Sequence, residues 1–491
     1  MAANIILGVF VSPIALYVGL RLGLSATQDP HEPRLSKLAS HSSVLYGALL
    51  PKNHIYTLRM PFIRQYIINS PSMIHHAQRQ IDQLTFGPVA LDFGFLFSGL
   101  NKQSQAILRE KYEHGNAFVT TINIQLRQGY SLNVMTSAAI QTLKTNLSSL
   151  GNPDSHITGL YSIVRSQVLI SLTDAFYGPH NPFRDPKLRD DWAEFLPGIK
   201  MLLFSPLPSI TARRALQARA RIAAAMTAFV QNGHHLSASP LVREGFEINI
   251  GYGLPFSEIG KMEIATLLAL LSSGAITTFW MLYHIFSDPA VLAQLREEIL
   301  DNLTEDGTFN SARRTIKLFN LRSKCPILHS TLQETFRVHS SVQSAKTVTQ
   351  DTSVDGYVFK KGGIVMIPGP VLHKNATIWG EDAENFNHQR FSAAASTPRT
   401  KNDVTPSSIG TSTFRPFGSG ATMCPGRHFS MNVILSIAAM MILQFDVVPI
   451  TETWAMPTTK QADLWNAMPK PDYDVDVQLL PREGQFDFIW Q

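Results

Sequence analysis

The stretch FRPFGSGATMCPGRHFS, Phe414 to Ser430, places one cysteine, Cys424, in a glycine-rich turn. Glycine adopts positive φ readily and lets a backbone approach a flat ligand closely. Three glycines surround the cysteine: Gly418, Gly420 and Gly426. Apolar residues then recur at helical spacing: Phe429, Val433, Ile437, Met440 and Met441. The sequence therefore predicts a thiol on a tight loop immediately before a buried helix.

Two roles are open to such a cysteine. Free cysteine is among the most buried residue types, so a structural role in the turn is the usual one. Backbone N–H groups at a helix N-terminus, however, stabilise a thiolate, and a thiolate beside an apolar wall can ligate haem iron. The haem ligand is favoured by the spacing F-x-x-G-x-x-x-C-x-G, which is formed by Phe417, Gly420, Cys424 and Gly426.

This loop resembles the haem-binding loop of the cytochrome P450 family. Its form PFGSGAT-x-CPGR is most similar to the branch of sterol 7α-hydroxylases and prostacyclin synthase. The resemblance implies a mainly α fold with a minor β region, haem b bound through the Cys424 thiolate, a cofactor contact from Arg415, and a fungal-type biosynthetic enzyme. Thr422 replaces the family's usual basic residue two positions before the cysteine, and Arg127 can substitute for a Trp-x-x-x-Arg motif that the chain lacks.

Composition excludes several other classes of protein. The chain has 491 residues, of which 44% are hydrophobic and 16% charged, so a large core is expected. Its two cysteines, Cys325 and Cys424, allow neither a disulfide framework nor a zinc knuckle. The net charge of +5 fits an anionic membrane surface or an acidic partner, and no basic run with interleaved aromatics indicates nucleic acid. Metalloprotease, P-loop and dinucleotide motifs are absent, so a reaction that needs electrons must receive them from a separate protein.

The N-terminal segment predicts a membrane anchor. Residues 2–20 carry no charge and are long enough to span a bilayer. A cleaved signal peptide is the alternative, but it needs a basic n-region that is missing here. We therefore expect an anchor over 1–24, a linker over 25–55 and a catalytic domain over 56–491. The expected location is the endoplasmic reticulum membrane, with a single span and a cytosolic catalytic domain.

A second uncharged run, from Ile264 to Ser287, contains a polar stripe that favours a helix buried against a ligand. The resemblance implies that this helix crosses the distal haem face, where the family has an acid–alcohol pair that delivers protons. In one alignment register with the family motif, Ser272 occupies the position of the acid and Ser273 that of the alcohol. In the other register, Thr277 occupies the position of the alcohol. Trp280 favours the first register. Both registers lack the carboxylate.

A structural ion cluster is predicted from three charged residues. Glu334 and Arg337 are three residues apart on the predicted helix 325–339, so they can pair. A surface ion pair is the default interpretation of that spacing. The resemblance instead implies a buried pair, completed by Arg390 of the segment WGEDAENFNHQRF, that supports the cysteine loop. Between these motifs, residues 340–369 are expected to form a small β-sheet.

Substrate contacts are implied at five residues by the resemblance: Phe93, Phe95, Ala269, Val342 and Trp465. The phenylalanines of LDFGFLFSGL alternate, which equally fits a buried strand edge or a loop core. Trp465 lies at a hairpin tip expected over Leu464–Met468, where core packing is an equal alternative.

Residues 192–232 carry four arginines that allow two interpretations. The arginines are Arg213, Arg214, Arg219 and Arg221. They can form an ordinary solvated face, or they can contact lipid headgroups while an apolar lid around Leu202 to Pro208 dips into the membrane. The predicted anchor favours the lid.

Two enzymatic hypotheses follow. The first is a membrane-anchored monooxygenase that oxidises a large apolar molecule, such as a steroid, triterpenoid or other terpenoid. It would use O₂ and electrons from NADPH, supplied by cytochrome P450 reductase with cytochrome b5 as a further partner. The second is an isomerase or dehydratase that uses neither O₂ nor NADPH, and the absent acid keeps it open. A haem-binding sensor or carrier is the non-enzymatic alternative.

Overall fold

A computed structural model describes residues 27–34, 54–60, 63–113, 115, 117–150, 157–205, 207–303, 313–392, 410, 412–420, 423–462 and 466–490. The predicted anchor, most of the linker, Thr422 and Trp465 lie outside these residues. The chain forms two compact units. Unit 1 comprises Met1–Ala90, Val342–Trp379 and Gly410–Met423, and unit 2 comprises Leu91–Ser341, Gly380–Ile409 and Cys424–Gln491. The peptide bond after Met423 therefore joins the two units within the cysteine loop.

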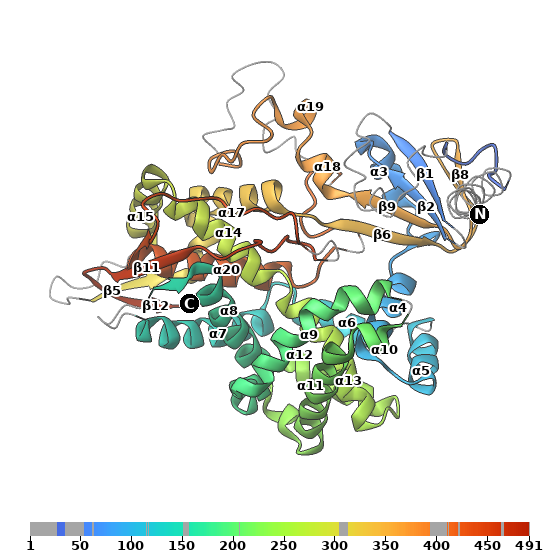
Figure 1. Ribbon diagram of the computed structural model, residues 1–491, viewed down its shortest axis with the longest axis horizontal. Coiled ribbons are helices and arrows are strands. Elements are labelled where there is room, and N and C mark those ends of the chain that lie inside the picture. Colours follow the sequence, from blue (N-terminus) through green and yellow to red (C-terminus); the bar gives the residue numbers. More distant parts are fainter. Residues whose placement is uncertain are drawn as a thin grey trace, which may run out of the picture. The chain divides into compact units, whose positions relative to one another are not determined.

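Unit 1 is built on a five-stranded sheet (Figure 1). Its order is β1 (Ile55–Met60), β2 (Ile63–Ile68), β9 (Ile364–Pro368), β6 (Gln343–Val348) and β3 (Leu84–Thr85). The β2 and β9 strands are parallel and the other pairs antiparallel. A hairpin of β7 (Thr352–Val354) and β8 (Tyr357–Phe359) turns through Asp355 and Gly356, both with positive φ. The β-structure predicted over 340–369 is thus confirmed by β6, β7, β8 and β9.

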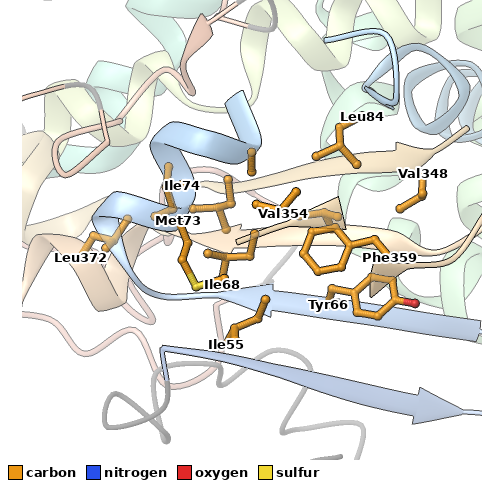
Figure 2. Close-up of a cluster of buried hydrophobic side chains, with 13 residues drawn as sticks. Ile55, Tyr66, Ile68, Met73, Ile74, Leu84, Val348, Val354, Phe359 and Leu372 are labelled. Atoms are coloured by element: carbon orange, nitrogen blue, oxygen red, sulfur yellow. The ribbon is translucent and has the colours of Figure 1, made fainter. Parts of the chain in front are cut away.

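The core of unit 1 lies between helix α3 (Pro71–Arg79) and the sheet. Figure 2 shows Met73 and Ile74 of α3 pointing toward strand side chains such as Ile68. Tyr66 stacks on Phe359 with ring centroids 4.7 Å apart, which adds an aromatic contact to the apolar burial. Two short helices follow β9: α18 (Gly369–His373) and α19 (Ala376–Trp379).

Unit 2 is mainly helical. Its N-terminal helices are α5 (Lys102–Glu113), α6 (Ala117–Gln125), α7 (Tyr130–Ser149), α8 (Leu160–Tyr177), α9 (Pro186–Phe204), α10 (Pro208–Thr211), α11 (Arg213–Gln231) and α12 (Pro240–Gly251). The later helices are α13 (Phe256–Leu271), α14 (Gly274–Phe286), α15 (Pro289–Leu303), α16 (Leu321–Lys324), α17 (Pro326–His339) and α20 (Arg427–Gln444). Small sheets pair β10 (Phe445–Pro449), β11 (Asp476–Pro481) and β4 (Thr158–Gly159), and β12 (Gln485–Ile489) with β5 (Arg313–Lys317).

Helix α14 lies at the centre of unit 2. It packs against α8, α17 and α20, and every residue from Ala275 to Phe286 is buried. Among the described residues, only α13 and α14 taken together, Phe256–Phe286, have the length and apolarity of a membrane span. Because α14 is covered by protein, its apolar surface belongs to the core. The burial of this run against a ligand, which its polar stripe favours, stays a prediction.

Two local expectations are corrected. The segment around Phe93 is neither strand nor loop, since α4 (Gly87–Ser98) is a helix that runs across the boundary between the units. Phe93 and Phe97 are four residues apart and therefore share a helix face, with ring centroids 5.9 Å apart. The run from Ile264 to Ser287 is also not one uninterrupted helix, because α13 ends at Leu271 and α14 begins at Gly274.

Candidate haem-thiolate site

Cys424 lies three residues before α20 and is held by the start of that helix. Its thiol is exposed, whereas α20 behind it is buried almost throughout. The protein around the sulfur desolvates the thiolate and raises the pKa of Cys424, while the backbone N–H groups of Gly426 and Arg427 act in the opposite direction. Arg427 also donates from Nη1 to the Cys424 carbonyl at 3.1 Å. An exposed cysteine next to the first N–H groups of a helix fits a thiolate that ligates a metal.

The unit 1 part of the loop contains a buried cation, Arg415, which is 2% exposed. Its Nη2 donates to Ser344 Oγ at 2.9 Å and to Ser419 Oγ at 2.8 Å, whereas Nε and Nη1 have no hydrogen-bond partner among the described residues. The backbone N–H of Arg415 donates to His373 Nε2 at 3.1 Å, which fixes its position. Burial lowers the pKa of Arg415 to about 10.

Lys346 of β6 is a second buried cation beside Arg415. It is 5% exposed, and its pKa is lowered by desolvation and by the nearby Arg415 charge. In the described part of the chain neither cation forms an ion pair. Two buried, unneutralised cations are costly without an anion, so these residues fit the carboxylates of a ligand such as haem. Lys346 was missed in the sequence because it lies inside a strand with no recognisable motif.

The predicted ion cluster is present and buried. Glu334 and Arg337 are fully buried and form two parallel hydrogen bonds of 2.8 Å. Arg390 donates from Nε to Glu334 Oε1 at 3.1 Å, and the Asn387 N–H donates to the same oxygen at 2.9 Å. Arg337 is satisfied further by the carbonyl of Asn385 at 2.9 Å.

Asp382 is a fourth member that the sequence did not indicate. It accepts from Nη1 and Nη2 of Arg390 at 3.1 and 2.9 Å. The hydrogen bond from Arg390 lowers the pKa of Asp382. Two carboxylates therefore face two guanidinium groups, and the cluster is electrically neutral, which a buried ion group requires.

The distal helix is interrupted at Ser272 and Ser273. Ser273 Oγ donates to Asn466 Oδ1 at 3.2 Å, and Asn466 Nδ2 donates to the Ser272 carbonyl at 3.0 Å. Thr277 is 1% exposed and donates from Oγ1 to the Ser273 carbonyl at 2.9 Å, inside its own helix. No carboxylate contacts either hydroxyl within the described residues. The Ser273 hydroxyl is therefore less buried than that of Thr277.

Other predicted contacts are more dispersed. Phe93 is 46% exposed, but Phe95 is buried, with the Arg109 guanidinium 5.0 Å from its ring centroid. Ala269 is exposed on α13, one turn before Ser273, and Arg127 is exposed after α6. Val342 is half-buried, and its carbonyl accepts from the Gly369 N–H at 2.9 Å. These residues therefore remain predictions as ligand contacts.

The arginines of the expected lid divide into two groups. Arg219 donates to the carbonyls of Leu96 and Phe97, both at 3.1 Å, and Arg221 pairs with carboxylates of α9. Arg213 and Arg214 are exposed. Arg219 and Arg221 therefore have partners within unit 2, and contact of these arginines with lipid headgroups stays a prediction.

Comparisons with known proteins agree with this chemistry. The family model of cytochrome P450 matches residues 266–475. The chain is 28% identical over 490 residues to cytochrome P450 monooxygenase nodJ of Hypoxylon pulicicidum, covering 95% of this chain and 93% of that protein. It is 26% identical over 461 residues to a cytochrome P450 monooxygenase of Gibberella zeae, covering 90% and 85%. A third relative, cytochrome P450 monooxygenase poxD of Penicillium oxalicum, is 28% identical over 64% of this chain.

The chain is therefore a cytochrome P450 monooxygenase, an enzyme with a haem iron ligated by a cysteine thiolate.

Proposed function

We propose that this enzyme hydroxylates a large apolar molecule of the steroid, triterpenoid or other terpenoid class in secondary metabolism. The observation that carries the proposal is the uncharged part of α13 from Ile264 to Leu271, on which Ala269 is exposed. An apolar wall of this kind favours an apolar ligand, because it offers no charged partner to a polar one. The exposed Phe93 next to Phe97 on α4 supports the same substrate class. Within the family, we infer that the enzyme belongs to the branch of sterol 7α-hydroxylases and prostacyclin synthase.

Different residues of the chain would have different roles in this reaction. Bound haem supplies oxygen chemistry. Cys424 would hold the iron, Arg415 and Lys346 would neutralise carboxylates, and the cluster around Glu334 would keep its segment rigid. Ser273 would orient a proton donor at the helix break. The overall reaction converts substrate R–H, O₂, NADPH and H⁺ into R–OH, water and NADP⁺, with the electrons supplied by a reductase and assisted by cytochrome b5.

Turnover of a terpenoid and steroid panel with purified reductase tests this function. NADPH consumption that matches hydroxylated product supports it, and no product with any member of the panel contradicts the substrate class. Cys424→His serves as the control for the iron ligand. It should lose the thiolate-specific Soret band of the reduced CO complex, and a variant that kept this band would refute the assignment of Cys424.

A rearrangement without O₂ or NADPH is the second candidate. It is favoured by one observation, the absence of a carboxylate at the helix break among the described residues. Anaerobic incubation with organic peroxides separates the two functions. Conversion of a peroxide without NADPH supports the rearrangement, whereas strict dependence on NADPH and O₂ supports the monooxygenase.

We also propose attachment to the endoplasmic reticulum membrane through residues 1–24, with the catalytic part in the cytosol. The exposed apolar residues near α10, Met201, Leu207 and Ile210, support contact with the bilayer, and Arg213 and Arg214 lie next to them. Removal of residues 1–24 should weaken membrane binding while haem content stays normal. Leu207→Ser in the truncated protein should weaken the residual binding to anionic vesicles, and unchanged sedimentation of both variants would contradict this proposal.

A further inference from the structure

The break between α13 and α14 is bridged by a residue from far along the chain. Asn466 lies 193 residues after Ser273, and its side chain contacts both sides of the break. Oδ1 accepts from Ser273 Oγ at 3.2 Å, while Nδ2 donates to the Ser272 carbonyl at 3.0 Å. A helix end leaves carbonyls without partners, so Nδ2 satisfies a group that the break exposes.

Asn466 is itself held in place by neighbouring segments of unit 2. Ser341 donates from Oγ to the Asn466 carbonyl at 2.7 Å and from its backbone N–H to the Ala467 carbonyl at 2.9 Å. Further along the segment, Trp280 of α14 donates from Nε1 to the Pro469 carbonyl at 3.0 Å, a contact that involves neither the Asn466 carboxamide nor Ser273. Oδ1 also accepts from the Met468 N–H at 3.4 Å, which fixes the orientation of the carboxamide. The amide is therefore positioned before any ligand binds.

The contact determines how Ser273 can act. A serine hydroxyl has one proton and two lone pairs. When that proton is donated to Asn466, Ser273 Oγ can only accept a hydrogen bond from a third group. Ser272 Oγ lies 3.4 Å away and provides a weak additional contact. A Ser273 held in this way accepts from a water molecule or a substrate hydroxyl and keeps that donor in one place.

We propose that Asn466 is a positioning residue for Ser273, and that its carboxamide organises the helix break where the family's carboxylate is absent. This inference rests on the hydroxylation proposed above. Asn466 does not donate a proton itself, because a carboxamide does not ionise near neutral pH. It sets the direction of the Ser273 hydroxyl and thereby the place of the proton donor.

The test compares Asn466→Ala, Ser273→Ala and the double variant in the haem-loaded enzyme with reductase. Each single variant should release about five- to tenfold more hydrogen peroxide per NADPH than the wild type, the effect of one net hydrogen bond. The double variant should match Ser273→Ala, because Asn466 acts through Ser273. Additive effects of the two substitutions would overturn the proposal.

Trp280→Phe provides the matched control, since it removes another hydrogen bond between α14 and the same segment. It should lower the thermal midpoint while leaving peroxide release close to that of the wild type. If Trp280→Phe released as much peroxide as Asn466→Ala, loosening of the segment would explain both results and the positioning role would be wrong.

Infrared spectroscopy of the reduced CO complex gives a readout that does not depend on turnover. Asn466→Ala and Ser273→Ala should shift the C–O stretching band in the same direction, whereas an unchanged band in Asn466→Ala would overturn the inference. A wild type that consumes no NADPH with any substrate overturns the monooxygenase function and this proton-handling role together. Normal turnover with an additive double variant overturns only the role of Asn466.

Discussion

Two buried glutamates of unit 2 are stabilised in different ways. Glu334 on α17 is fully buried and accepts from two guanidinium groups and one backbone N–H. Glu263 on α13 is 5% exposed and accepts from the hydroxyls of Tyr177 at 2.8 Å and Thr266 at 3.4 Å. No cation contacts Glu263 among the described residues. Desolvation accordingly raises the pKa of Glu263 to about 7.

The difference shows how each region tolerates buried polar groups. The cluster around Glu334 balances its charges, so removing one member leaves an unpaired ion in the interior. On α13 and at the break before α14, the buried polar groups can be neutral, and hydroxyls and a carboxamide provide their hydrogen bonds. Loss of a partner should therefore be severe in the first region and mild, or even favourable, in the second.

Arg337→Ala should have the largest effect on stability. It leaves Glu334 buried with Arg390 as its only remaining cation, and breaking such a pair typically costs about 3–5 kcal/mol. We expect a large loss of haem incorporation, measured as haem per protein after purification. Normal haem content with a selective loss of turnover would indicate a catalytic rather than structural role for Arg337.

Glu334→Leu/Arg337→Met separates loss of charge balance from loss of the cluster itself. Replacing both members of a buried pair with apolar residues is often neutral or stabilising. The double variant should therefore recover part of the haem content lost in Arg337→Ala. A double variant that is worse than the single one would show that the hydrogen bonds to Ala383, Asn385 and Asn387 are the important contribution.

Glu263→Gln should stabilise the folded protein, whereas Arg337→Ala destabilises it. The folded protein retains a proton on Glu263 that the unfolded chain releases, so stability falls as pH rises from about 5 to 7 and is level above this range. A pKa difference of this size between the folded and unfolded states corresponds to roughly 3 kcal/mol in the free energy of unfolding. Glutamine is neutral at every pH, so the variant should unfold at a higher temperature than the wild type at pH 8. The gain should disappear at pH 5, and equal gains at both values would contradict the raised pKa.

The two regions also differ in how far the sequence predicts them. Glu334 and Arg337 could be paired because they are three residues apart on a predictable helix. Asn466 could not be assigned to Ser273, since a contact over 193 residues follows from the tertiary fold and not from local spacing. Lys346 and Asp382 were missed because neither lies in a recognisable motif.

Helix α4 was misassigned for a different reason. Alternation of Phe93, Phe95 and Phe97 has the period of a strand, yet the helix places the first and third on one face. Phe95 lies on another face, below Arg109, where it is buried. An aromatic run of this length fits both periods, and contacts with other helices decide between them.

Asp382→Asn should produce a smaller effect than Arg337→Ala, although it belongs to the same cluster. The Asp382 side chain is 50% exposed, so solvent screening limits its pair with Arg390 to at most about 1 kcal/mol. Because Arg390 lowers the pKa of Asp382, this contribution is present at neutral pH and is lost as pH falls below about 4. Thermal midpoints should therefore differ at pH 7 and converge at acidic pH. A loss as large as that in Arg337→Ala would mean that Asp382 is essential to the cluster.

Thr277→Ala should have the smallest effect, and it tests which register of the distal helix is correct. The Thr277 hydroxyl donates to the Ser273 carbonyl, which already accepts from the Thr277 backbone N–H at 2.9 Å. Losing a second donor to that carbonyl leaves it satisfied, and alanine favours the helix, so stability should change by less than about 1 kcal/mol. Peroxide release per NADPH should stay close to the wild-type value while Ser273→Ala raises it. If Thr277→Ala raised it as much as Ser273→Ala, the Thr277 hydroxyl would have to leave its helical partner during turnover. The register with Thr277 as the alcohol would then be correct, and the distal region would depend on a buried hydroxyl rather than on the bridge from Asn466.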